Sequence, residues 1–257
     1  MAEHRTFRRA QARIPSRQSL GDGMRAALDV LYPRNCMGCG ISSPKAFRYL
    51  CWDCWSDAPH IEAPFCACCG DPVAGSVDHE FICYSCSAQK PAFDGARSAA
   101  RYDGVVGEGL RRLKYEKAWW LVPDLAELLL KGMRAEYSDL TFDWIVPVPL
   151  HPIRQRKRGF NQSGLLAREL GRRIGRASGR SLLRRIKPTS TQTNLTAPQR
   201  LSNVQNAFES RCHERLAGQS ILLVDDVMTT GATVNACAKA LKKGGAQSVH
   251  VLTVARG

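Results

Sequence analysis

Residues 221–233 have the sequence ILLVDDVMTTGAT. The run from Ile221 to Val224 is short and apolar, which predicts a buried strand, and the acids Asp225 and Asp226 follow it directly. A loop rich in threonine then leads into a predicted helix over residues 232–243. Ligands of parallel α/β sheets bind at the carboxyl ends of the strands, and this loop lies at such an end. The stretch therefore predicts an α/β fold and a ligand site within it.

The loop after the two acids has the chemistry of a phosphate cradle. Backbone N–H groups and the positive end of the helix dipole favour an anion at the start of a helix. Thr229, Thr230 and Thr233 add hydroxyl donors, and Gly231 lets the backbone approach a ligand. The acids are placed to hydrogen-bond the hydroxyls of a sugar next to that phosphate. The simpler alternative, a capped helix, does not explain two consecutive acids after a strand.

Further strands and helices are predicted on both sides of this loop. Strands are expected over residues 98–102, 144–148 and 248–254, and helices over 105–114, from Pro123 and from Ser163. Strands that alternate with helices predict a parallel sheet covered by helices on both faces.

Nine of the eleven cysteines lie between Cys36 and Cys86. Eight of them form four CxxC pairs in two repeats: Cys36, Cys39, Cys51 and Cys54, then Cys66, Cys69, Cys83 and Cys86. Two CxxC turns brought together supply four thiolates, which is the tetrahedral site that zinc prefers. Because all eight thiolates are then committed to metal, the sequence predicts two structural zinc sites.

Three points about the cysteines stay open at the level of sequence. Pairing in chain order is the simpler arrangement, and interleaving is the alternative. Cys68 is predicted to be a spare thiol, and competition with Cys69 as a ligand is the alternative. Buried cysteines without metal and a disulfide framework are further alternatives. The first residues contain no apolar run as long as that of a secretory signal, so we expect the cytoplasm, where reducing conditions favour metal over disulfides.

The formal net charge of the 257 residues is +14, and it is unevenly distributed. Residues 151–215 hold 15 Lys and Arg against three Asp and Glu. A hydrophobic content of 44% excludes a disordered basic protein, and the lack of any run of about 20 apolar residues excludes a membrane-spanning helix. We predict a disordered basic tail over residues 1–19, a helix with a double zinc ribbon over 20–90, and the α/β domain over 91–257.

The stretch ILLVDDVMTTGAT resembles the phosphoribosyl-pyrophosphate (PRPP) signature of type I phosphoribosyltransferases. Two further stretches, VPVPLHPIRQRKRGFNQ at 146–162 and TQTNLTAPQRLSNVQNAF at 191–208, resemble the ComF family of competence-associated proteins. The cysteine-rich head before the Leu-Lys-Tyr115 segment does so too. The resemblance covers roughly residues 30–257. It implies a type I phosphoribosyltransferase-like parallel sheet with helices on both faces, preceded by a small zinc-ribbon domain.

The resemblance also implies roles for individual residues. Asp225 and Asp226 would hold ribose hydroxyls at the catalytic centre, with Mg²⁺ bridging ribose oxygens and pyrophosphate. The 5′-phosphate would lie against Thr229, Thr230, Gly231, Ala232 and Thr233. The loop after the strand at 144–148 would face the pyrophosphate, with His151, Arg154, Arg156, Lys157 and Arg158 as candidates. The segment Thr191–Arg200 resembles a mobile lid.

The same basic cluster has a second possible use. Arg154 and Arg156 can neutralise DNA phosphates, and Phe160 beside them can stack on unpaired bases. Pyrophosphate binding is the competing interpretation, and the arginines of the helix from Ser163 are alternatively a solvated face.

Three functions therefore stand as hypotheses, and whether the chain is an enzyme stays open among them. The first is a ComF-like protein that binds PRPP or a related sugar phosphate and handles single-stranded DNA during natural transformation. The second is an active phosphoribosyltransferase of nucleotide metabolism whose acceptor is unidentified. The third is a zinc-ribbon adaptor that docks a DNA-uptake helicase or channel protein and has lost catalysis.

Overall fold

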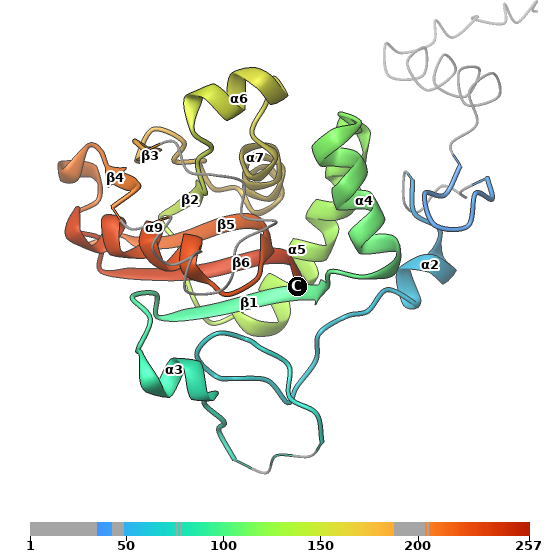
Figure 1. Cartoon of the computed structure of the whole chain (residues 1–257), viewed down its shortest axis with the longest axis horizontal. Coiled ribbons are helices and arrows are strands. Elements are labelled where there is room, and N and C mark those ends of the chain that lie inside the picture. Colours follow the sequence, from blue (N-terminus) through green and yellow to red (C-terminus); the bar gives the residue numbers. More distant parts are fainter. Residues whose placement is uncertain (1–34, 43–48, 76, 78, 188–203, 205) are drawn as a thin grey trace, which may run out of the picture.

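The centre of the molecule is a four-stranded sheet in the order β1-β6-β5-β2 (Figure 1). The computed structural model describes residues 35–42, 49–75, 77, 79–187, 204 and 206–257. The strands are β1 (Gly95–Arg101), β2 (Trp144–Pro147), β5 (Ser220–Met228) and β6 (Ser248–Arg256). All neighbouring strands of this sheet are parallel, which confirms the predicted architecture.

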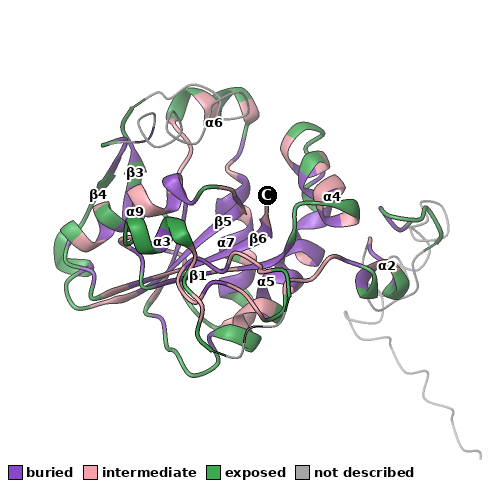
Figure 2. Ribbon diagram, turned by 60° about the horizontal axis from the view of Figure 1, so that its bottom comes forward, coloured by how far each residue is buried: buried purple, intermediate pink, exposed green. Residues whose placement is uncertain are grey.

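Helices cover both faces of the sheet and bury its strands (Figure 2). One face carries α4 (Gly104–Tyr115), α5 (Val122–Glu136) and α7 (Gln162–Ile174), and the other carries α9 (Ala232–Lys243). Side chains of β5 alternate between the two cores. Leu222 and Val224 pack with α5 and α7, whereas Ile221 and Leu223 pack with α9. This alternation is why a strand buried on both faces has a continuous apolar sequence.

The two cysteine repeats pack at different places on this α/β body (Figure 1). The first contains α2 (Trp52–Ser56) and contributes Met37 and Leu50 to the core of α4 and α5. The second contains α3 (Tyr84–Ala88) and contributes Cys66 and Cys86 to the core of α9. Each repeat is therefore anchored to a different core of the same sheet.

The predicted end of the strand at Val224 was wrong, because β5 continues to Met228. Its pairing with β6 places Asp225 opposite Thr253 and Met228 opposite Arg256. The hydrophobic run ends at Val224, but hydrogen bonding between the strands does not. Both acids are thus fixed within the sheet and do not lie in a loop.

Two features of the basic region were not predicted. One is helix α6 (Pro152–Arg158), which buries none of its residues and so has no apolar period. His151 caps its start, and Pro152 occupies its first turn. The other is the antiparallel pair of β3 (Leu183–Arg185) and β4 (Phe208–Ser210). Two short 3₁₀ turns, η1 (Trp119–Leu121) and η3 (His213–Arg215), complete the described elements.

Two sequence-based predictions lie outside the described residues: the basic tail over 1–19 and the lid segment Thr191–Arg200. Within the part of the chain that the structure describes, no helix combines the length and apolarity needed to cross a membrane.

Candidate functional site

The phosphate loop lies between β5 and α9. Gly231 precedes α9 with a φ of 75°, a left-handed conformation that glycine adopts without strain. A Cβ on Gly231 would lie 2.9 Å from Cε of Met228, the far end of a flexible side chain, so it is the backbone conformation that favours glycine here. The hydroxyl of Thr230 accepts a hydrogen bond of 3.4 Å from the N–H of Ala232. This is a local bond in the turn before α9, whose N-cap residue is Gly231 and which has no side-chain cap.

A cavity of about 710 Å³ brings together residues from distant parts of the chain. It is lined by α4, α6 and the ends of β2 and β5, on the side where α4 and α6 project from the sheet in Figure 1. The predicted site residues on its wall are Arg154, Lys157, Arg158, Asp225, Asp226, Thr229 and Thr233. A second cavity, of about 660 Å³, lies between α9 and the β3–β4 pair and contains only Ala232 of the predicted set.

The two acids are held by a network of hydrogen bonds. The Ser163 hydroxyl donates to Oδ1 of Asp225 at 2.6 Å, and the amide of Gln162 approaches Oδ1 of Asp226 at 3.4 Å. Arg158 donates to Oε1 of Gln162 at 2.8 Å, which connects α6 to the acid pair. The ammonium of Lys114, at the end of α4, forms an ion pair with Oδ2 of Asp226.

This network gives the neighbouring acids different proton affinities. Burial and the adjacent carboxylate of Asp226 raise the pKa of Asp225 well above its ordinary value. Burial acts in the same direction on Asp226, but the charge of Lys114 outweighs it and lowers the pKa of Asp226. Protonation is therefore favoured at Asp225 and ionisation at Asp226, whose carboxylate faces the ammonium of Lys114.

Several cavity residues were missed by sequence reasoning. They are Tyr102, Lys114, Tyr115, Gln162, Ser163 and Arg185. Lys114 and Tyr115 belong to the Leu-Lys-Tyr segment, and Gln162 ends the basic stretch at 146–162, so both signals were present as family motifs. Nothing in the spacing of these residues linked them to the acids, because the sheet topology alone brings them together.

Helix α6 presents only part of its basic cluster to the cavity. Arg154, Lys157 and Arg158 line the wall, whereas Arg156 is exposed and does not. His151 accepts the N–H of Ile153 at 3.4 Å, so it serves as the helix cap. The prediction that this segment faces the cavity thus applies to three of its side chains.

The prediction that Phe160 stacks on bases is wrong for this conformation. Phe160 is 8% exposed and packs edge-on against Trp119, with ring centroids 5.8 Å apart. Trp119 itself is 54% exposed, and Tyr115 is 65% exposed. The guanidinium of Arg158 lies 5.8 Å from the ring centroid of Tyr115. Exposed aromatic surface therefore exists beside α6, but Tyr115 and Trp119 provide it.

Arginines of α7 are engaged within the molecule. Arg172 pairs with Glu169 at 2.8 Å, and Arg173 pairs with Glu169 at 3.0 Å and also with Glu127. Glu169 has a pKa lowered to about 2 by the guanidinium of Arg172, with Arg173 adding to the effect. These charges are balanced locally, which supports the interpretation of this helix as a surface face.

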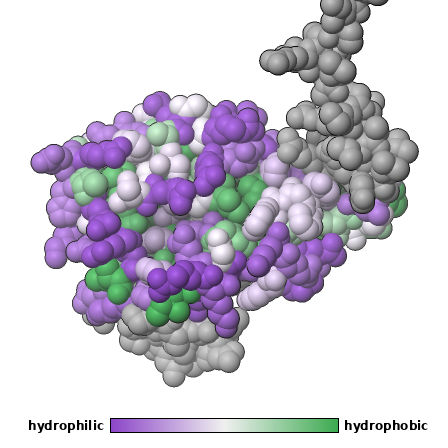
Figure 3. All heavy atoms as spheres, turned by 90° about the horizontal axis from the view of Figure 1, so that it is seen from above, coloured by the Kyte–Doolittle hydropathy of each residue, from purple (hydrophilic) through white to green (hydrophobic). Residues whose placement is uncertain are grey.

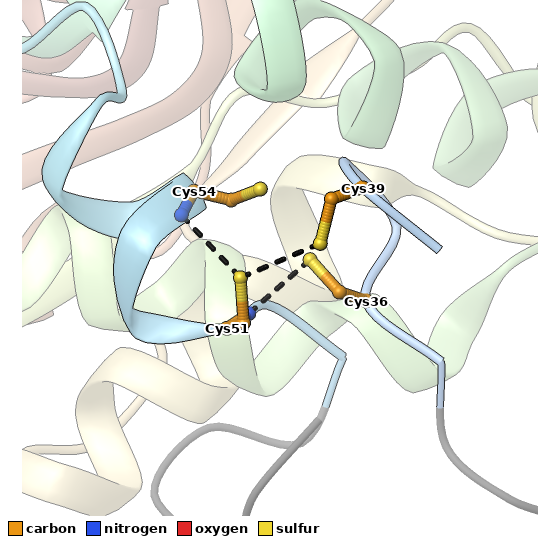
Figure 4. A group of neighbouring side chains, drawn as sticks. All are labelled: Cys36, Cys39, Cys51 and Cys54. Atoms are coloured by element: carbon orange, nitrogen blue, oxygen red, sulfur yellow. Dashed lines mark hydrogen bonds between the residues drawn. The ribbon is translucent and has the colours of Figure 1, made fainter. Parts of the chain in front are cut away.

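The cysteines form two tetrads in chain order, and Figure 4 shows the first of them. One consists of Cys36, Cys39, Cys51 and Cys54, the other of Cys66, Cys69, Cys83 and Cys86, with all ligand atoms of a tetrad within 4.8 Å of one another. Sulfurs bound to one tetrahedral zinc are about 3.8 Å apart, given Zn–S bonds of about 2.3 Å. The Sγ atoms of Cys39 and Cys51 are 3.6 Å apart, and those of Cys69 and Cys83 are 3.7 Å apart. The residues present therefore fit zinc, and interleaved pairing is excluded.

Backbone N–H groups favour the ionised form of one thiol in each tetrad. Burial opposes ionisation of Cys36, but N–H groups of its own knuckle and of Cys51 outweigh it and lower the pKa of Cys36 to about 6. The same balance lowers the pKa of Cys66 to about 7. Cys68 is not a member of either tetrad, and burial raises the pKa of its thiol. Two closed sets of four thiolates are structural zinc sites.

Two protein-family models match this chain, one over the cysteine repeats and one over part of the α/β domain. The double zinc ribbon domain matches residues 27–87, and the phosphoribosyl transferase domain matches residues 156–257. Matches among solved structures include a glutamine PRPP amidotransferase from B. subtilis (18% identity, TM-score 0.35, 52% of this chain and 26% of that chain). An adenine phosphoribosyltransferase from Thermoanaerobacter pseudethanolicus is another (20% identity, TM-score 0.33, 56% of this chain and 83% of that chain).

Curated relatives are similar over nearly their whole length. Competence protein F of Haemophilus influenzae is 31% identical over 225 residues, which cover 86% of this chain and 96% of the relative. The DNA utilization protein YhgH of Escherichia coli K12 is 32% identical over 228 residues, 87% of this chain and 97% of the relative. Competence protein ComFC of Bacillus subtilis is 28% identical over 82% of this chain and 86% of the relative. The motif-based resemblance is thereby confirmed, and the chain belongs to the ComF family, the family of competence protein F.

Proposed function

We propose that this chain binds PRPP or a related sugar phosphate in the cavity between α4 and α6. We further propose that it acts in DNA uptake during natural transformation by handling single-stranded DNA in the cytoplasm. One observation carries the proposal: a single cavity contains Thr229 and Thr233 of the phosphate loop, the acid pair and three basic side chains of α6. The names of the relatives, competence protein F and DNA utilization protein YhgH, support the cellular role.

The chemistry of the cavity walls supports a sugar phosphate as ligand. Thr229 and Thr233 offer hydroxyls next to the start of α9, where backbone N–H groups and the helix dipole favour an anion. The acids lie beside them and accept hydrogen bonds, as ribose hydroxyls require. The basic side chains Arg154, Lys157 and Arg158 line the same cavity and suit a second phosphate group, which PRPP supplies as pyrophosphate with its Mg²⁺.

The surface around the cavity supports single-stranded DNA as partner. The face that carries α4 and α6 is mostly hydrophilic, as Figure 3 shows from above. Tyr115 and Trp119 add exposed aromatic rings beside the basic end of α6. Exposed rings next to a positively charged groove are the combination with which proteins bind single strands without sequence preference.

Calorimetric titration with PRPP and Mg²⁺ tests the ligand proposal. Thr229→Val and Thr233→Val remove a hydroxyl at almost unchanged volume, and Thr141→Val, exposed on the loop before β2, is the matched control. A hydrogen bond to a charged group contributes about 1.5–3 kcal/mol, so each cavity variant should bind PRPP about 10- to 150-fold more weakly than wild type. Lack of PRPP binding by wild type, or equal binding by all variants, would refute the proposal.

Transferase activity is a second candidate, favoured by the intact acid pair and the size of the cavity. Incubation with PRPP, Mg²⁺ and a panel of nucleobases, followed by detection of released pyrophosphate, would reveal it. Binding of PRPP without release of pyrophosphate would separate ligand binding from catalysis.

A further inference from the structure

The ion pair between Lys114 and Asp226 closes one side of the candidate sugar site. The two side chains are 17% and 6% exposed, so both charges are largely removed from water. Lys114 lies in the last turn of α4, and Asp226 lies within β5, which holds the contact between two ordered elements. A buried charge is costly without a partner, and each of these groups is the other's partner.

The Oδ1 atoms of both acids are also engaged. Oδ1 of Asp226 faces the amide of Gln162 at 3.4 Å. Oδ1 of Asp225 accepts the Ser163 hydroxyl at 2.6 Å and the backbone N–H of Asp226 at 2.9 Å. One ammonium thus faces two adjacent, buried carboxyl groups.

This arrangement does not fit a divalent cation at the acids. Mg²⁺ requires oxygen ligands in octahedral geometry at about 2.1 Å and binds ionised carboxylates. To bind here it would have to displace the ammonium of Lys114 from Asp226. A lysine ammonium occupies the place where a metal would otherwise neutralise the pair.

We propose that Lys114 is the built-in counter-cation of the acid pair, so that the ribose 5-phosphate portion of a ligand binds this cavity without a divalent cation. Mg²⁺ is then needed only where the ligand brings a pyrophosphate group of its own. Lys114 acts as a positioning residue, since it keeps a carboxylate of Asp226 available to accept a sugar hydroxyl. The inference rests on the proposed sugar-phosphate site.

Two measurements test this proposal. In the first, ribose 5-phosphate is titrated into zinc-loaded protein with and without Mg²⁺, in buffer freed of metals by resin so that no chelator attacks the zinc sites. We expect wild type and Lys114→Arg to bind it with a Kd that Mg²⁺ changes by less than about twofold. Tightening by Mg²⁺ of about tenfold or more in wild type would overturn the proposal.

The second measurement counts Mn²⁺ binding by electron paramagnetic resonance without any sugar. Lys114→Gln removes the ammonium, and Lys131→Gln, exposed on α5, is the control. We expect Lys114→Gln to bind Mn²⁺ at least about tenfold more tightly than wild type, Lys114→Arg and the control. Equal Mn²⁺ affinity in wild type and Lys114→Gln overturns the counter-cation role. If wild type fails to bind ribose 5-phosphate while Lys114→Gln gains the Mn²⁺ site, the counter-cation role stands and the sugar-phosphate site falls.

Discussion

Asp225 and Asp226 are consecutive residues of β5, yet their carboxyl groups lie in opposite electrostatic surroundings. Asp226 faces the ammonium of Lys114, whereas Asp225 faces the hydroxyl of Ser163 and the carboxylate of Asp226. The pKa of Asp225 is therefore raised and that of Asp226 is lowered. The same conservative substitution should consequently change stability in opposite directions at the two positions.

Asp225→Asn should stabilise the protein, and more so at higher pH. The folded pKa of Asp225 lies above its unfolded pKa, so protonation of this carboxyl stabilises the folded state. This stabilisation is fully present below the unfolded pKa and is lost as the pH rises through the folded pKa. An amide cannot ionise, so the variant does not lose this stability as the pH rises. Each pKa unit corresponds to about 1.4 kcal/mol. Denaturant midpoints of the variant and wild type should therefore diverge progressively as the pH rises above the unfolded pKa of about 3.9.

Asp226→Asn should destabilise the protein, because it leaves the ammonium of Lys114 buried without its carboxylate. Breaking a buried ion pair costs about 3–5 kcal/mol, and we expect the lower end because Asp225 can ionise in compensation. Asp139→Asn, on the exposed loop before β2, is the neutral control. Midpoint shifts of the same sign for Asp225→Asn and Asp226→Asn would contradict this account of the pair.

The second zinc ribbon is fastened to the sheet through close backbone contact. The N–H of Ala96 in β1 donates to the carbonyl of Cys68 at 2.9 Å, and Arg256 in β6 pairs with Asp71 at 3.0 Å. A Cβ on Gly70 would lie 2.5 Å from the carbonyl oxygen of Ala96. Gly40, the equivalent position of the first ribbon, has nothing within 4 Å of such a Cβ.

The two glycines therefore form a matched pair for mutation. Gly40 and Gly70 have φ values of 75° and 67°, so alanine brings about 1–2 kcal/mol of left-handed strain at either position. Gly70→Ala should cost about 1–3 kcal/mol more, because Ala96 must move. Thermal unfolding of the zinc-loaded variants measures the difference. Equal losses of stability in Gly40→Ala and Gly70→Ala would show that the second ribbon can move away from Ala96 at no cost.

Each tetrad should hold its zinc independently. Cys54→Ser and Cys86→Ser each remove one thiolate from a different set of four. Metal analysis should find two zinc per chain in wild type and one in each variant, because a closed structural site depends on all of its ligands. Release of both ions after a single substitution would indicate that the sites depend on one another for folding.

The sequence predicted the features that local patterns encode. The apolar run before Asp225 identified a central strand, and the CxxC spacing identified all eight members of the tetrads. Helix α6 was missed because a helix that buries nothing needs no apolar period. Lys114 was missed as a partner of Asp226 because only the folded sheet brings α4 to the end of β5.

Phe160 illustrates a different limit of sequence reasoning. An aromatic residue beside a basic cluster has the composition of a stacking surface, but composition does not say which ring is covered. Here Trp119, from the 3₁₀ turn after α4, covers Phe160 and remains exposed itself. We therefore expect the exposed ring of Trp119, and not the buried ring of Phe160, to stack on unpaired bases.

This expectation gives a prediction for single-stranded DNA. Tyr115→Ala and Trp119→Ala should each weaken binding of an oligothymidine by about 1–3 kcal/mol, the range for removal of one stacked base. Trp120 is the matched control because it is 53% exposed, close to the exposure of Trp119. Its ring centroid lies 6.4 Å from that of Tyr49 in the first ribbon, whereas the ring of Trp119 packs against Phe160. Trp120→Ala should bind like wild type.

Charge on α6 should contribute separately from stacking and be recognised by its salt dependence. Arg154→Ala and Arg156→Ala should each make the slope of log K against log salt concentration shallower. The expected change is about 0.7 for every DNA phosphate that loses its guanidinium partner. Trp119→Ala should leave that slope unchanged, because it removes no charge. Fluorescence anisotropy at several salt concentrations measures both effects. If Trp119→Ala binds as tightly as wild type, or Trp120→Ala weakens binding as much as Trp119→Ala does, the strand does not run along the aromatic surface beside α6.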